Sequence, residues 1–155
     1  MYAFVIDSNF RTNFQPVQQD DMLFRYSITT NKGNWKQACL RNFGWAVCNP
    51  LMPVQIRGKK DGNFENRASF CRLDRPNVFL LTLKMAENGD GLIARVIETE
   101  GKRTTATLTM PYLNIKKVYR TNLVEENEHE LTFTDNRIEV SLDAFGITTI
   151  RIKTS

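Results

Sequence analysis

Two strongly apolar runs flank a glycine-rich turn, ENGDG at residues 87–91, and this arrangement constrains the fold more than any other feature of the sequence. Asn-Gly and Asp-Gly supply the positive φ angles that a tight hairpin needs, so residues 77–100 are predicted to form a strand, a turn and a second strand. By the two-residue period of a strand, both runs place apolar side chains on both faces. A hairpin of this composition is expected at the centre of a sheet.

Further strand patterns lie on both sides of this hairpin. Residues 105–110 alternate threonine with apolar residues, which predicts a strand with one face on a core. A second hairpin is predicted over residues 131–140, with its turn at residues 135–136. In the last strand the apolar residues fall out of phase, so a one-residue bulge is expected near residues 148–149. Other predicted strands cover residues 3–6, 22–29 and 114–121.

One segment, residues 34–43, has the pattern of a helix. Asn34 can cap its first turn, and Gly44 is placed to end it. The apolar stripe that includes Trp35 and Phe43 is expected to pack on a core, as such stripes do when helices lie beside sheets.

Composition excludes several classes of site. The three cysteines are an odd number and have no C-x-x-C spacing, which argues against a disulfide framework and against a zinc site. The net charge is +4, but the only lysine doublets are Lys59-Lys60 and Lys116-Lys117, and the other basic residues are scattered among acids. We therefore expect solvated surface charge and no nucleic-acid partner.

No membrane association is expected either, because the sequence has no run of 18 apolar residues. Residues 1–6 lack the basic start and the long apolar core of a signal peptide, so a cytoplasmic location is favoured.

Several short motifs occur in a fixed order along the chain. They are Leu83-Lys84, Ala86-Glu87, Gly89, Gly91-Leu92-Ile93, Arg95, Glu98, Asn122-Leu123-Val124-Glu125 and the segment 145–152, with Phe24-Arg25-Tyr26-Ser27 and Asn49-Pro50 before them. This series resembles the C-terminal β-domain of glycoside hydrolase family 38, the α-mannosidase-type enzymes.

The resemblance implies a fold and a domain organisation. We expect an all-β domain, a mainly antiparallel β-sandwich of the galactose-mutarotase-like kind found at the C-terminus of glycosidases, with about eight or nine strands in two packed sheets and one short helix. Residues 1–155 are expected to form this single domain, as the C-terminal fragment of a larger glycosyl hydrolase.

The resemblance also implies where the chemistry lies. Family 38 enzymes are retaining glycosidases that hold the sugar on a zinc ion bound by His and Asp residues of another domain. This chain has one histidine, His129, and its acidic residues at 20–21 and 125–130 are expected to be solvated. We therefore expect no catalytic residue, no metal and no cofactor in this chain, which alone should be inactive. Its expected partners are mannosides and the catalytic domain of the same polypeptide.

The candidate sugar contacts are Arg11, Asn13 and Gln18, in the polar loop of residues 7–18. Their amide and guanidinium groups suit sugar hydroxyls, and the resemblance implies that this loop turns toward the mannose site. The alternative is that Asn13 hydrogen-bonds the backbone of its own loop. A second functional hypothesis is a free-standing carbohydrate-binding module. In that module the stacking aromatic residues would be Trp35, Trp45, Phe10 and Phe14.

Overall fold

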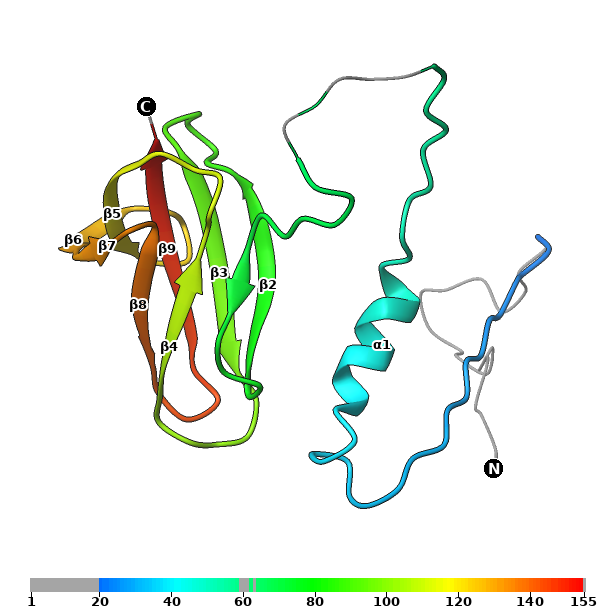
Figure 1. The fold of residues 1–155 in the computed structure, drawn as a ribbon. Coiled ribbons are helices and arrows are strands. Elements are labelled where there is room, and N and C mark those ends of the chain that lie inside the picture. Colours follow the sequence, from blue (N-terminus) through cyan, green and yellow to red (C-terminus); the bar gives the residue numbers. More distant parts are fainter. Residues whose placement is uncertain (1–19, 59–61, 63, 155) are drawn as a thin grey trace. The chain divides into compact units, whose positions relative to one another are not determined.

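The computed structural model describes residues 20–58, 62 and 64–154. The chain divides into two compact units, Met1–Arg57 and Gly58–Ser155, and each is described by itself. The described residues contain one helix and nine strands, and every strand lies in the second unit (Figure 1). That residues 1–155 form one domain stays a prediction.

The helix of the first unit, α1, spans Leu40–Cys48, so the predicted range of 34–43 is wrong at both ends. Asn34 does act as a cap, because its Oδ1 accepts bonds from the backbone N–H groups of Lys36 and Gln37 at 3.1 and 3.0 Å. The turn that it caps precedes α1 and is separated from it by Cys39, which has a left-handed φ of 48°.

The predicted stop at Gly44 is also wrong, because this glycine lies inside α1. A glycine inside a helix costs only about 1 kcal/mol, so it does not force an end. The helix ends instead at Asn49, which donates its backbone N–H to the Trp45 carbonyl at 2.8 Å. The following Pro50 disfavours helical backbone at Asn49. The only helix among the described residues is too short and too polar to cross a membrane.

The described part of the first unit lacks the predicted core and the predicted strand. No residue of α1 is buried, and Trp35 and Trp45 are 53% and 41% exposed, so the predicted core stripe is not observed within this unit. Residues 22–29 alternate as predicted but form no strand. An alternating pattern becomes a strand only where a neighbour supplies its hydrogen bonds, and none does so here among the described residues. The strand predicted for residues 3–6 lies outside the described residues.

The second unit is a sandwich of two antiparallel sheets, which confirms the predicted fold class. One sheet has the strand order β1-β4-β8-β7 and the other has the order β2-β3-β9-β5-β6. The strands are β1 (Arg72–Leu73), β2 (Val78–Met85), β3 (Leu92–Glu98), β4 (Thr104–Thr109), β5 (Ile115–Thr121), β6 (Asn127–Leu131), β7 (Phe133–Thr134), β8 (Arg137–Leu142) and β9 (Ile147–Thr154).

The hydrophobic core consists of alternating side chains from the two sheets. Ile138, Val140 and Leu142 on β8 are each at most 2% exposed, whereas the residues between them are exposed. Ala94 and Val96 on β3 and the pair at 150 and 152 on β9 belong to the same cluster. This period-2 pattern is the one that a sheet with one face on a core requires.

Both predicted hairpins are present, but the first lies at an edge. β2 pairs with β3 through the predicted turn, and β2 is the terminal strand of its sheet, while β9 is central. The second apolar face of the hairpin is covered by long charged side chains. Ile93, fully buried, lies in register between Lys84 and Arg151. Long basic side chains bury their aliphatic stems on apolar surface, so the hairpin does not need a central position.

Two further predictions concern local backbone. Asp135 and Asn136 have φ angles of 48° and 60°, which confirms the predicted turn of the second hairpin. The bulge predicted near residues 148–149 is wrong, because β9 pairs with β3 without a register shift from Ile147 to Ile152. The apolar residues that are out of phase have another explanation. Phe145 lies in a turn, with a φ of 55°, and Ile147 pairs with Ile97 on the face of the sheet away from the core.

Candidate functional site

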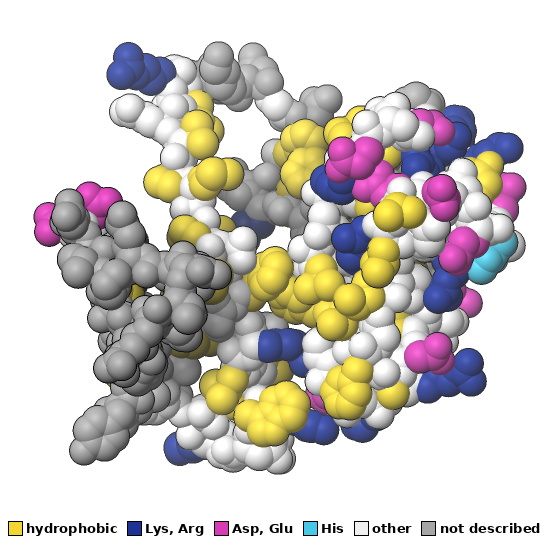
Figure 2. All heavy atoms as spheres, turned by 180° about the vertical axis from the view of Figure 1, so that it is seen from behind, with side chains coloured by type: hydrophobic (Ala, Val, Ile, Leu, Met, Phe, Trp, Pro, Cys, Tyr) yellow, Lys and Arg dark blue, Asp and Glu magenta, His cyan; other side chains and the backbone are white. Residues whose placement is uncertain are grey.

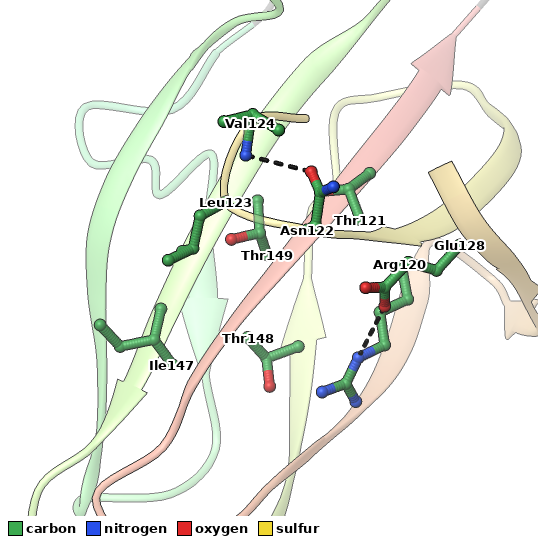
Figure 3. A pocket seen from close by; sticks show the side chains of 9 residues that line it. All are labelled: Arg120, Thr121, Asn122, Leu123, Val124, Glu128, Ile147, Thr148 and Thr149. Carbon is green, nitrogen blue, oxygen red and sulfur yellow. Dashed lines mark hydrogen bonds and ion pairs between the residues drawn. The ribbon is translucent and has the colours of Figure 1, made fainter. Parts of the chain in front are cut away.

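The candidate site is a hollow at the end of β5, beside the start of β9. The last pair between these strands is Thr121 with Thr149, so Ile147 and Thr148 continue β9 past the end of β5. The hollow has a volume of about 460 Å³ and is lined by residues 120–124, Glu128 and residues 147–149. We call it the β5–β9 notch. Figure 3 shows Leu123 and Ile147 on one side of β9 and Arg120 and Glu128 on the other.

The polar side of the notch carries a loose ion pair. Arg120 Nε lies 3.6 Å from Glu128 Oε2, and the two side chains are 36% and 48% exposed. A register irregularity at the end of β5, between Arg120 and Thr121, precedes the loop that forms the opposite wall. Within the described part of the chain, the guanidinium has no other hydrogen bond or ion pair. Both charged groups therefore keep hydrogen-bonding capacity toward the notch.

The opposite wall is the loop of residues 122–126, whose shape follows from its first residue. Asn122 Oδ1 accepts bonds from the backbone N–H groups of Val124 and Glu126, both at 3.0 Å. Asn122 Nδ2 also donates to the Glu126 carboxylate at 2.8 Å. An asparagine that bonds the backbone two residues ahead sets such a turn, and here Glu125 takes a positive φ of 68°. The turn exposes Leu123 and Val124.

Arg95 of β3 fixes this loop to the sheet. Its Nη2 donates to the Leu123 carbonyl at 2.9 Å, and its Nε donates to Thr149 Oγ1 at 3.1 Å. Arg95 and Thr149 are paired across β3 and β9, so the guanidinium reaches over the central strand. Because the Thr149 hydroxyl accepts this bond, its own hydrogen is left to donate.

Arg151 of β9 holds the far end of the same loop. Its side chain is buried, at 3% exposure, and Nη2 donates to the Glu125 carbonyl at 2.7 Å. Nη1 donates to the Asp90 carbonyl at 2.6 Å and to Asn88 Oδ1 at 2.9 Å. A buried arginine is stable only when such acceptors surround it. Arg151 thus joins the turn of the β2–β3 hairpin to the 122–126 loop.

The Glu125 carboxylate completes this connection. Lys84 Nζ donates to its Oε1 at 2.8 Å, and the backbone N–H of Glu87 donates to its Oε2 at 2.8 Å. The bond from Lys84, followed by that from Glu87, lowers the pKa of Glu125, and the same contact raises the pKa of Lys84. Glu125 was predicted to be solvated with the rest of its acidic run, but it is only 7% exposed. Its neighbours from 126 to 130 are exposed, including His129.

At the opposite end of β3, Glu98 is fully buried and receives five hydrogen bonds. The donors are the Asn77 amide and the backbone N–H groups of Glu100, Gly101, Lys102 and Phe145, at 2.7–3.1 Å. Burial alone would raise the pKa of Glu98, but these bonds outweigh it and lower the pKa to about 2. A general acid needs a pKa near the working pH, so Glu98 is a structural carboxylate.

The sequence-predicted contacts Arg11, Asn13 and Gln18 lie outside the described residues, as do Phe10 and Phe14. Among the described residues, no group of three or more His, Cys, Asp or Glu side chains is arranged to hold a metal ion. The sequence analysis did not predict the notch residues as site residues. Their only signal was the Asn122–Glu125 motif, which lies between Arg120 and Glu128.

A cluster of exposed rings was missed as well. Phe64, Phe70 and Tyr112 lie with ring centroids 5.0–5.5 Å apart. The angles between their planes are 56–89°, so these three rings pack edge to face on one another and form no flat platform for a sugar.

The fold defines the class of this unit as an antiparallel β-sandwich. Among the described residues, two carboxylates are buried, those of Glu98 and Glu125, and both hold loops in place. Residues 77–150 match the family model for the glycosyl hydrolases family 38 C-terminal beta sandwich domain. This match confirms the resemblance that the motifs indicated, for the residues that it covers. No curated protein matches the chain.

Proposed function

We propose that this sandwich packs on the catalytic domain of an α-mannosidase-type glycosidase, in the same polypeptide, and contributes to carbohydrate binding there. The family match over residues 77–150 is the observation that carries the proposal. The state of the carboxylates supports it. Glycoside cleavage uses a pair of carboxyl groups roughly 5–9.5 Å apart, with one of them able to give up a proton near neutral pH. Glu98 and Glu125 are both held as anions by hydrogen bonds, so the chemistry is assigned to the other domain.

The two edges of the five-stranded sheet indicate which surface packs. β6, at one edge, reads NEHEL, and four of its five residues are exposed polar ones. Charged edges of this kind resist pairing with other chains. β2, at the other edge, reads VFLLTLKM and exposes Leu83 and Met85 at 40% and 60%. An exposed apolar edge strand is usually buried by a packing partner, and we propose that the catalytic domain is this partner.

Other exposed apolar side chains occur on this unit, among them Phe64, Phe70 and Tyr112. Figure 2 shows hydrophobic side chains gathered on one face of the sandwich, beside a region of Lys, Arg, Asp and Glu side chains. Leu83 pairs with the core residue Ala94, and Met85 pairs with Leu92, which packs against the core. Neither Leu83 nor Met85 belongs to the core cluster. The end of β2 therefore presents an apolar ledge, and we call these two residues the β2 ledge.

Association of separately produced domains tests the packing. The catalytic domain of the polypeptide is mixed with the full 155-residue chain, and complex formation is measured by calorimetry and gel filtration, alongside hydrolysis of an aryl α-mannoside. We expect binding that is weakened at least about tenfold by Met85→Lys, since a charge is costly in an apolar contact. Glu130→Lys, an exposed change on the opposite edge strand, is the matched control and should bind like the native chain.

Two outcomes would contradict the proposal. One is a catalytic domain that is fully active alone and shows no binding to this chain. The other is binding that Met85→Lys leaves unchanged, which would place the contact elsewhere than the β2 ledge. Hydrolysis by the 155-residue chain alone, tracking the protein through purification, would overturn the assignment of chemistry to the other domain.

A further inference from the structure

We infer that the β5–β9 notch is a binding site for a single neutral pyranose ring, with Arg120 and Glu128 as its polar contacts and Leu123 and Ile147 as its apolar ones. The inference rests on the proposed role in carbohydrate binding and assigns it to residues of the sandwich itself. The notch and the β2 ledge share no residue, so sugar binding and domain packing can be tested separately.

The size of the notch suits a small ligand. Its volume of about 460 Å³ lies within the roughly 300–1,000 Å³ of small-molecule pockets. The hollow results from the lengths of the paired strands. β5 ends at Thr121, which pairs with Thr149 of β9, but β9 begins two residues before Thr149, at Ile147. The 122–126 loop then turns back over the sheet and is held there by Arg95. The notch is therefore built from regular strands and from a loop anchored to them, and it is formed before any ligand binds.

The polar groups match the hydrogen-bonding needs of sugar hydroxyls, each of which both donates and accepts. Arg120 donates in a planar fork, and its Nε contact to Glu128, at 3.6 Å, is longer than a hydrogen bond. Glu128 accepts only. Two neighbouring hydroxyls can therefore bond the guanidinium and the carboxylate together, one accepting from Arg120 and the other donating to Glu128. The Thr149 hydroxyl, which accepts from Arg95, lies on the same face of β9 as Ile147 and so on the apolar side of the notch.

The base of the notch holds a buried hydroxyl. Thr121 is 4% exposed, and its hydroxyl has no hydrogen-bond partner among the described residues. A buried hydroxyl without a partner costs free energy. Because this oxygen is itself closed to solvent, it is not a ligand contact in this structure. Thr121 and Thr149 are paired across β5 and β9, which places both side chains on the same face of the sheet.

The apolar side and the balance of charge define the class of ligand. Leu123 and Ile147 are 62% and 45% exposed, and they lie across β9 from the ion pair (Figure 3). Apolar side chains opposite hydrogen-bonding groups suit a ring with C–H groups on one face and hydroxyls at its rim. The positive charge of Arg120 is balanced by the negative charge of Glu128, so a phosphate or carboxylate ligand would be repelled by the Glu128 anion. A neutral sugar meets no such repulsion.

Titration of the full 155-residue chain with methyl α-D-mannopyranoside and methyl α-D-glucopyranoside, followed by amide NMR signals, tests the inference. We expect saturable shifts at Leu123, Ile147 and Thr149 with at least one of the two glycosides. Arg120→Met should weaken binding about tenfold, because it removes charge-assisted bonds. Glu128→Gln keeps the shape and should also weaken it. Arg137→Met, on β8 of the other sheet, is the matched control and should leave the affinity unchanged.

Three results would overturn the inference. They are the absence of saturable shifts with both glycosides, affinities that neither notch variant changes, and tighter binding of inorganic phosphate than of either glycoside. Arg120 is 36% exposed, so its variant should fold, and unchanged strand signals in the NMR spectrum check this. Saturable shifts confined to residues outside the notch would reject this site while leaving the proposed carbohydrate role intact. Association with the catalytic domain, measured with Met85→Lys, stands or fails independently of either result.

Discussion

Glu98→Gln is the substitution whose effect the structure predicts most sharply. The side chain keeps its shape, but the carboxylate loses its charge and one of its two acceptor oxygens becomes an NH₂ donor. Each oxygen of Glu98 now accepts at least two bonds, from the Asn77 amide and from four backbone N–H groups. Whichever way the amide turns, its NH₂ group must face N–H donors in a site that is fully buried.

The pKa gives the magnitude of the charge effect. Lowering the pKa of Glu98 from its ordinary 4.5 to about 2 corresponds to about 3 kcal/mol of stability, at about 1.4 kcal/mol for each pKa unit. Backbone N–H groups left without an acceptor add about 1–3 kcal/mol each. We therefore expect Glu98→Gln to lower the free energy of unfolding at pH 7 by at least about 3 kcal/mol, a large part of the roughly 5–15 kcal/mol of a typical domain.

The dependence on pH identifies the cause. A carboxyl group whose pKa is lowered by folding stabilises the folded state fully above its unfolded pKa of 4.5, and this contribution is lost as the pH falls toward about 2. The difference between the native chain and Glu98→Gln should therefore be largest near neutral pH and should shrink steadily between these two values. A simple packing defect would not titrate.

Urea unfolding, followed by the amide NMR signals of β3 and β9, measures this difference at several pH values. Glu139→Gln, on the exposed face of β8, is the control and should stay within about 0.5 kcal/mol of the native chain. If Glu98→Gln also stays within that limit at pH 7, or if its effect is constant down to pH 3, the reasoning from the five hydrogen bonds is refuted.

The same unfolding assay checks four further substitutions. Gly91→Ala should cost about 2–4 kcal/mol, because φ is 92° and the new Cβ would lie 2.6 Å from the Ile152 carbonyl oxygen, whereas Gly89→Ala, at φ of 73° in open space, should cost about 1 kcal/mol. Equal losses would contradict this. Arg151→Met should cost about 2–4 kcal/mol by stranding buried acceptors, and a neutral effect would contradict it. Glu125→Gln should destabilise at neutral pH, and its effect should vanish on acidification, since its pKa is lowered by folding.

What the sequence predicted correctly depends on local signals. The β2–β3 hairpin was predictable because five consecutive residues, 87–91, determine its turn. The turn at residues 135–136 was predictable for the same reason, since its residues are adjacent in the sequence. The sandwich follows from period-2 patterns in strands such as β8. The errors arose where a local pattern lacked a partner. Residues 22–29 alternate without a neighbouring strand among the described residues, and Gly44 resembles a stop signal although Pro50 ends the helix.

The notch could not be predicted because it depends on the registers of strands distant in the sequence. Arg120 and Glu128 meet only because β5 pairs with β6 with a register irregularity at the end of β5. Ile147 reaches the same hollow only because β9 continues past the end of β5. The amphipathic patterns of these strands do not determine either register. Scattered charges along a sequence also do not indicate which charged residues will lie close together in the fold.

The motif residues themselves explain how such a site is maintained. Arg95, Glu125 and Arg151 carried the family resemblance in the sequence, and in the structure each one fixes a loop to the sheet. None of them has to touch a sugar for a substitution to disturb sugar binding. Since Arg95 donates both to the Leu123 carbonyl and to Thr149, it fixes the loop wall of the notch relative to β9. The motifs that identify this domain therefore specify the positions of its loops, and the residues that meet a ligand lie between those anchors.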